Sequence, residues 1–235
     1  MLVAAAVCPC PPLLVPEVAV GAAPELAAAR TACADAIGVL AAARPDRLVV
    51  VGPAGEGERG PHHAGAIGSF SGFGAAISVR LGTGEPQARP LPTSLTVGAW
   101  LLDRARWAAS PVAGLGVDEA LDSARCRETG REIAAEAPRI ALLVMSDGSA
   151  CRSLKAPGYL DERAEGFDAL AARALGSADL AALRTLDASL AHELKAAGRA
   201  PWQVLAGAAE GAGLDGRLLY DAAPYGVGYF VATWS

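Results

Sequence analysis

The sequence predicts an α/β fold, a single layered domain over residues 1–235 with a mixed, largely parallel central sheet flanked by helices. Short apolar runs of strand length alternate with alanine-rich segments of helical length, which is the pattern of such folds. No linker and no internal repeat divides the chain. A length of 235 residues with 52% hydrophobic and 19% charged side chains allows one large core.

The expected strands are short, apolar and bounded by glycine, proline or polar residues. The clearest is 139–145, which ends in a polar turn at Ser146. The full set is 2–7, 47–51, 76–81, 111–117, 139–145, 217–220 and 228–233.

The expected helices are placed by their start and stop signals. The first, 24–43, has Pro24 in its first turn, Glu25 beside its positive end and Pro45 beyond its end. Thr93 or Ser94 caps the next helix. The full set is 24–43, 93–107, 119–136, 160–175, 178–197 with a break near 185, and 201–211.

Composition limits the partners and the compartment. A net charge of −5 argues against a nucleic-acid surface or an anionic membrane surface. The N-terminal apolar run is too short for a signal segment or a membrane span, so we expect a cytoplasmic protein. Five cysteines give no disulfide framework, and alanine-rich helices are compatible with a homo-oligomer.

Candidate functional residues follow the ends of the predicted strands, where open α/β sheets bind ligands. Cys8-Pro9-Cys10-Pro11-Pro12 follows the first strand, and Asp147 to Cys151 follows the strand 139–145. Asp221 to Tyr225 lies between the last two strands. A Gly-rich loop, 54–74, carries His62 and His63 and is a candidate lid with Phe70 and Phe73 as its apolar face.

These segments resemble the catalytic (B) subunits of class III extradiol ring-cleavage dioxygenases, in particular the relatives fused to AMMECR1-type domains. The resemblance covers most of the chain in outline and is most specific at the two ends, in Cys10-Pro11-Pro12-Leu13 and in Tyr220-Asp221 with Pro224 to Tyr229. It implies an α/β domain whose relatives hold Fe(II) with two histidines and one carboxylate, while a third histidine acts as acid/base.

Compared with that pattern, this chain replaces most of the histidines. Cys10 stands at the position of the first metal ligand, and Ala54 follows Pro53 at the position of the second. Cys151 stands at or beside the position of the acid/base, and Asp221 at that of the carboxylate. An unmodified extradiol mechanism is therefore not expected.

Only three histidines are present in the whole chain, whereas the relatives' chemistry needs three in one pocket. His192 falls in the middle of a helix, at its surface. His62 and His63 remain, and adjacent side chains on an extended loop tend to point apart.

Three interpretations fit these residues. In the first, the cysteines pack as small apolar residues, and a catalytically degenerate scaffold binds a small ligand or a protein partner without turnover. In the second, Cys8 or Cys10, Cys151, one of the two loop histidines and Asp221 form a rebuilt metal site that favours Zn²⁺ over Fe(II).

In the third interpretation, Cys151 is a nucleophile whose thiol pKa is lowered by the preceding Gly-Ser-Ala turn and by Arg152. Asp147 or Asp221 would then orient a loop histidine as its base. Tyr225 is a further candidate for the pocket lining. The predicted function is thus dioxygenase-like with an altered site, either as a metal-dependent oxidoreductase acting on a small aromatic compound or as a binding scaffold.

Overall fold

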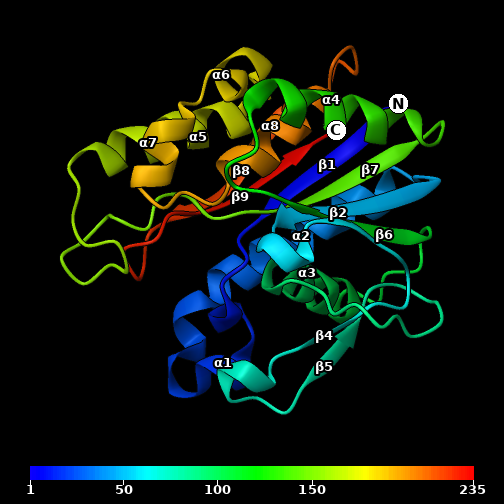
Figure 1. Ribbon diagram of the computed structural model, residues 1–235, viewed down its shortest axis with the longest axis horizontal. Helices are drawn as coiled ribbons and strands as arrows, with labels where there is room; N and C mark the ends of the chain where they lie inside the picture. The colour runs from blue at the N-terminus through cyan, green and yellow to red at the C-terminus, as the bar shows by residue number, and fades with distance from the viewer.

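A mixed sheet of seven strands lies in the middle of the molecule, in the order β3-β6-β2-β7-β1-β9-β8 (Figure 1); the computed structural model describes residues 1–235. Four neighbouring strands are parallel: β6 (Val112–Val117), β2 (Arg47–Pro53), β7 (Ile140–Met145) and β1 (Leu2–Cys8). The antiparallel strands are β3 (Gly60–His62), β9 (Tyr229–Trp234) and β8 (Gly216–Ala222). The predicted mixed, largely parallel sheet is confirmed.

Helices cover both faces of this sheet, so its central strands are apolar on both sides. On one face lie α4 (Ser123–Ala135), α5 (Arg163–Gly176), α6 (Leu180–Arg184), α7 (Ala188–Glu193) and α8 (Arg199–Ala208). On the other lie α2 (Ala27–Ala42) and α3 (Thr93–Arg104), with the short α1 (Pro16–Ala19) beyond the sheet. Each face carries a core of 33 buried residues, so neither layer is a minor attachment.

The register of the parallel strands brings their carboxyl ends to one edge of the sheet. Cys8 pairs with Met145, and Pro53 pairs with Val117. β2 and β7 are paired up to Val51. The segments that follow all four strands therefore meet at the same edge, as the sequence led us to expect.

The largest departures from the predicted elements are in the segments before helices and in the Gly-rich loop. The helix expected from 119 begins at Ser123. Asp122 caps it, because its carboxylate accepts hydrogen bonds from the backbone N–H groups of Ala124 and Arg125. The helix expected over 178–197 is broken around Thr185 into α6 and α7, as predicted. The Gly-rich loop contains β3 and also β4 (Ile67–Ser69), which pairs with β5 (Ser78–Arg80).

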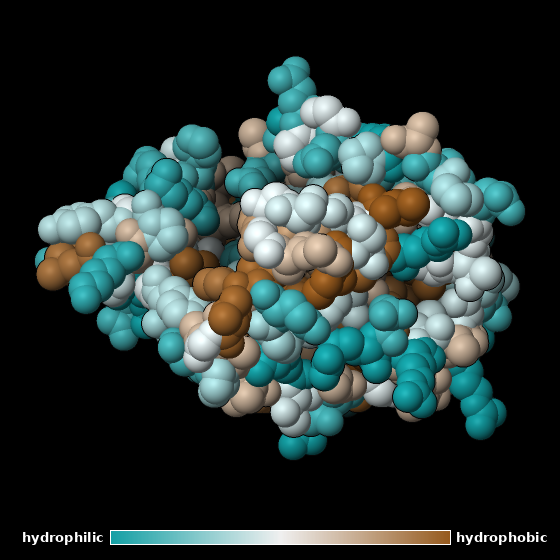
Figure 2. All heavy atoms as spheres, turned by 90° about the horizontal axis from the view of Figure 1, so that it is seen from below, coloured by the Kyte–Doolittle hydropathy of each residue, from teal (hydrophilic) through white to brown (hydrophobic).

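The surface on the side of α1 and the β4–β5 hairpin is largely hydrophilic, with a band of hydrophobic side chains across its centre (Figure 2). Val20, which follows α1, and Phe73, between β4 and β5, are exposed large hydrophobic residues. Single exposed hydrophobic side chains of this kind are ordinary on protein surfaces. None of the helices has the length and apolar character needed to cross a membrane.

Candidate functional site

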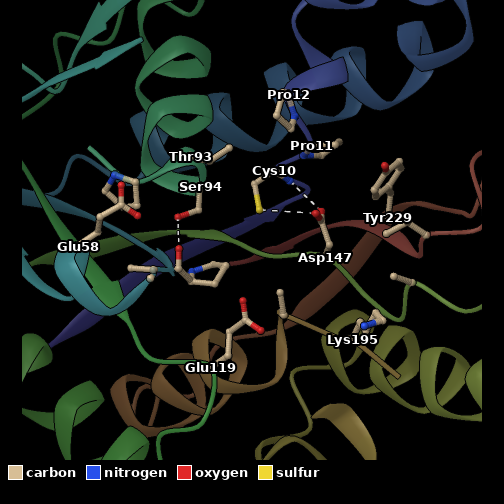
Figure 3. A pocket seen from close by; sticks show the side chains of 17 residues that line it. Cys10, Pro11, Pro12, Glu58, Thr93, Ser94, Glu119, Asp147, Lys195 and Tyr229 are labelled. Carbon is tan, nitrogen blue, oxygen red and sulfur yellow. Dashed lines mark hydrogen bonds between the residues drawn. The ribbon is translucent and has the colours of Figure 1, made fainter. Parts of the chain in front are cut away.

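A cleft of about 440 Å³ opens at the edge of the sheet where the four parallel strands end (Figure 3). Cys10 follows β1, Pro53 ends β2, Glu119 follows β6 and Asp147 follows β7, and all four residues line the cleft. Open α/β sheets bind their ligands at this edge, and the volume suits a small organic molecule. The cleft is therefore the candidate functional site.

The floor of the cleft contains a thiol and a carboxyl group in contact. Asp147 Oδ1 accepts the backbone N–H of Cys10 at 2.9 Å, and the Cys10 thiol donates to Asp147 Oδ2 at 3.8 Å. Burial raises the pKa of Asp147 to about 6, although both hydrogen bonds from Cys10 lower it. Burial, followed by the charge of Asp147, raises the pKa of the Cys10 thiol well above its usual value. At neutral pH the pair is thus a carboxylate and a neutral thiol.

The segment after β7 that carries Asp147 is fixed from the opposite side by a buried carboxylate, Asp168 of α5. Asp168 accepts the backbone N–H and the hydroxyl of Ser149, each at 2.8 Å, and pairs with Arg152 at 3.1 Å. Burial raises the pKa of Asp168, and the three donors offset that effect. The turn from β7 is therefore rigid, and Asp147 has a defined position.

The start of α8 fixes two further parts of the cleft. The backbone N–H of Gly198 donates to the carbonyl of Asp147 at 2.8 Å. The buried guanidinium of Arg199 donates to the backbone carbonyl of Glu119 and, at 2.5 Å, to that of Leu121. One helix start thus positions the backbone of both Asp147 and Glu119.

The wall between β2 and α3 is held by Ser94, whose hydroxyl donates to the carbonyl of Pro53 at 2.6 Å. The close approach of Ser94 to β2 requires a glycine at position 52, because a Cβ on Gly52 would lie only 2.6 Å from the Ser94 hydroxyl oxygen. The start of α3 is therefore tied to the end of β2, and the cleft has a fixed width on this side.

The lining has four more polar side chains, those of Glu58, Thr93, Lys195 and Tyr229 (Figure 3). Tyr229 is only 3% exposed, yet its hydroxyl makes no hydrogen bond with the protein and is not enclosed by protein atoms. The exposed part of this side chain therefore includes its hydroxyl group. Lys195 is the one cationic residue of the lining.

The metal ligands predicted from the sequence do not meet, and the predicted metal site is wrong in its ligand set. Cys10 lies in the cleft, but Asp221 is exposed on β8, which is the outermost strand on one side of the sheet. His62 lies on β3, the outermost strand on the other side. Six strand spacings, or roughly 29 Å, separate β3 from β8. No three His, Cys, Asp or Glu side chains lie close enough together to hold a metal ion. The donor set therefore does not fit the Fe(II) site or the Zn²⁺ site that the resemblance led us to consider.

The two loop histidines occupy different environments. His62 is buried, and its Nε2 donates to the backbone carbonyl of Glu58 at 2.8 Å. His63 is exposed, so the two side chains point apart as expected. Both line a separate cavity of about 260 Å³ beside Arg89. The Gly-rich loop therefore does not restore a ligand to the main cleft.

Cys151 is also outside the cleft. It is 2% exposed in the core on the α5 side of the sheet, and its thiol lies 3.5 Å from the backbone carbonyls of Gly158 and Leu194. Burial raises its pKa, contrary to the lowered value expected for a nucleophile. Its neighbour Ala150 is the residue that lines the cleft. The predicted catalytic role of Cys151 is therefore not supported by its position.

Two other predicted pocket residues and the predicted lid are displaced as well. Cys8 is fully buried on the α2 side, and its hydrogen bond with Cys33 raises its pKa. Tyr225 does not line the cleft. Phe70 is buried and Phe73 is exposed, and neither lines the cleft. The loop contributes Ala54, Gly55 and Glu58 instead.

Sequence reasoning found Cys10 and Asp147 but missed the other polar lining residues. Glu119 was open to the same argument, because it follows the strand 111–117 as Asp147 follows 139–145. Glu58 and Lys195 carry no such signal, since their place depends on how a loop and a helix–helix connection cross the sheet edge. Tyr229 was missed in favour of Tyr225, four residues earlier in the same segment, which does not line the cleft.

Comparisons with known proteins extend the description of the fold only. No family model matches the chain, and no curated protein matches it. Among solved structures, the chain is similar to a crystal structure of an uncharacterized protein from Escherichia coli K12, with a TM-score of 0.52 and 14% sequence identity. The match covers 99% of this chain and 100% of the other. The TM-score indicates a shared fold, and an identity of 14% supports no conclusion beyond the fold.

Proposed function

We propose that this protein is a class III extradiol dioxygenase-like scaffold with an altered site, whose cleft binds a small organic ligand without metal-dependent ring cleavage. The observation that supports it is the composition of the cleft at the strand ends. Cys10, at the position that the resemblance gives to a histidine ligand, is in contact with Asp147, and no histidine lines the cleft.

The side chains of the cleft suit recognition by hydrogen bonds and charge. The facial arrangement that holds Fe(II) uses two histidines and one carboxylate. Here the cleft offers carboxylates, a neutral thiol, a tyrosine hydroxyl and one lysine. Hydrogen bonds within the protein hold Asp147 and Ser94 in defined positions before a ligand arrives, which reduces the entropic cost of binding.

The test combines metal analysis with ligand binding. The protein is purified without chelator or metal-affinity resin, and its iron and zinc contents are measured before and after anaerobic loading. We expect far less than one ion per chain in both cases, no turnover of catechols, and binding of small molecules detected by ligand-observed NMR. Asp147→Asn is expected to change that binding, and Asp221→Asn, on the edge strand, is the matched control that leaves it unchanged.

Near-stoichiometric metal that is lost in the Cys10→Ala variant, together with oxygen consumption on a catechol, would establish a metal-dependent oxidoreductase instead. Absence of any ligand in a broad fragment screen would contradict the binding function.

A further inference from the structure

The three acidic side chains of the cleft have no cationic partner. Asp147, Glu119 and Glu58 take part in no ion pair within the protein, although all three line the same cavity. Acidic residues just outside the cleft are paired: Asp118 with Arg59 at 2.8 Å and Asp168 with Arg152 at 3.1 Å. The arginines of this region therefore pair with acidic residues outside the cleft and leave those inside it unpaired.

Unpaired carboxylates that surround a half-enclosed space repel one another and attract cations, because the low dielectric of the walls reduces screening. Lys195 is the only positive side chain of the lining, so with all carboxyl groups ionised the three acids and one base leave the cleft a formal charge of −2. Figure 3 shows Glu119 and Asp147 reaching into the cleft from different sides.

A second observation is independent of these charges. Tyr229 is 3% exposed, lines the same cleft, and has a hydroxyl with no hydrogen-bond partner in the protein. Because the hydroxyl is the accessible part of an otherwise buried side chain, it can exchange a hydrogen bond with a ligand in the cleft. Asp147 has spare capacity too, since a carboxylate accepts about four hydrogen bonds and Cys10 supplies only two.

The carboxylate of Asp147 is held by the fold and does not need to be ordered by the ligand, whereas the side chain of Glu119 is exposed. Asp147 is fixed by Cys10 and by Gly198, and the backbone of Glu119 is fixed by Arg199. An ammonium group has three N–H donors and no acceptor, so it can use the acceptor positions that Asp147 has free.

We propose that the ligand of this cleft is a small organic amine, whose ammonium group is bound by the carboxylate of Asp147, with Glu119 and the hydroxyl of Tyr229 in the walls around it. This assignment rests on the proposed binding function and specifies its ligand class. Glu58 adds negative potential at the rim. A volume of about 440 Å³ limits the ligand to a small molecule.

The test uses matched probes in which one carbon skeleton carries an ammonium, a hydroxyl or a carboxylate group. Benzylamine, benzyl alcohol and benzoate form one set, and butylamine, butanol and butyrate form another. Dissociation constants are measured by NMR titration of the whole protein at about pH 7. We expect each amine to bind about tenfold or more tightly than its alcohol, and the carboxylates most weakly.

Variants then place the amine in the cleft. Asp147→Asn should weaken amine binding by about tenfold, and Glu119→Gln and Tyr229→Phe should each weaken it by several-fold. Asp103→Asn, an exposed acid on α3 outside the cleft, removes the same charge and should leave the affinity unchanged.

Two results would overturn the assignment, and they are distinguishable. Alcohols or carboxylates that bind as tightly as the amines, with the affinity still sensitive to Asp147→Asn, would remove the amine specificity and keep the binding function. A cleft that binds none of the six probes and no other fragment would remove both.

Discussion

Asp147 and Cys10 connect the ends of two neighbouring parallel strands through a hydrogen bond of 2.9 Å from backbone to carboxylate. β1 and β7 are paired up to Cys8 and Met145, and the Ser146 N–H donates to the Cys8 carbonyl at 2.9 Å just beyond. The carboxylate therefore continues the contact between the strands after the backbone ladder ends. A titratable group in this place makes the stability of the sheet edge depend on pH.

We expect Asp147→Asn to be more stable than the wild type above about pH 6. Burial raises the pKa of Asp147 from 3.8 to about 6. Between these two pH values the carboxyl group is ionised in the unfolded chain but still protonated in the folded protein. The folded state therefore loses stability as the pH rises through this range. A shift of about two pKa units corresponds to at most ~3 kcal/mol. Asparagine keeps an acceptor for the Cys10 N–H and cannot ionise.

Urea denaturation across about pH 3.5 to 8 measures this difference. The advantage of the variant should approach its minimum below about pH 4 and be fully present above pH 6. Asp103→Asn serves as the control for loss of one negative charge. A difference between Asp147→Asn and wild type that stays constant with pH would show that Asp147 titrates normally in the folded protein.

Arg199→Met should destabilise the protein by about 3 kcal/mol, because a buried guanidinium here satisfies several buried acceptors. Arg199 donates to the carbonyls of Glu119 and Leu121 and to the side chain of Gln203 at 3.0 Å. Methionine fills similar volume and leaves these acceptors unpaired.

The measurement is the free energy of unfolding from urea denaturation. Arg173→Met, at an exposed position of α5 without an ion pair, should change it by less than about 0.5 kcal/mol. Equal small effects in the two variants would mean that water replaces the Arg199 contacts without loss.

The fold was largely predictable because its strands are continuous apolar runs. The strands 2–7, 47–51, 111–117 and 139–145 were identified by their short length and by the proline, glycine or polar residues that flank them. The start of α4 was not predictable in the same way. Asp118 and Asp122 are both suitable caps, and Asp118 instead closes a turn through the Ala120 N–H.

The candidate site was predictable only in part. The convergence of parallel strand ends is a general rule, and it correctly brought Cys10 and Asp147 together. The order of strands across the sheet is not written in any single segment. His62 and Asp221 were expected near each other, and the sheet places them at opposite edges because β3 and β8 are the two outermost strands.

Gly207→Ala should destabilise the protein by about 3 kcal/mol, because α4 and α8 pack with their backbones in close contact. A Cβ on Gly207 would overlap the backbone of Arg127, and a Cβ on Gly130 would overlap the carbonyl of Val204. No side-chain rotation relieves a clash with backbone atoms, so the helices must move apart.

Gly38→Ala is the matched control, since it also replaces a helical glycine but has no atom near the new Cβ. It should raise stability by up to about 1 kcal/mol through the higher helix propensity of alanine. Thermal or urea unfolding of the two variants tests the pair of predictions, and a gain in stability for both would contradict the close contact between α4 and α8.

Cys10 should be the first of the five cysteines to react with iodoacetamide in the folded protein. It is the one that lines the cleft, whereas Cys8, Cys33, Cys126 and Cys151 are enclosed in the cores. The reaction should be slow near neutral pH, because burial and the Asp147 carboxylate raise the thiol pKa and only the thiolate is alkylated. At pH values below that pKa, the rate should increase about tenfold for each unit by which the pH is raised.

Peptide mass spectrometry after timed labelling identifies the modified residue. Asp147→Asn should accelerate the labelling of Cys10 at a given pH, because removal of the neighbouring negative charge lowers the thiol pKa. A small amine in the cleft should slow the same reaction by covering the thiol. If Cys151 were labelled first, the segment from Cys151 to Tyr159 would open in solution, and the thiol mechanism set aside here would have to be reconsidered.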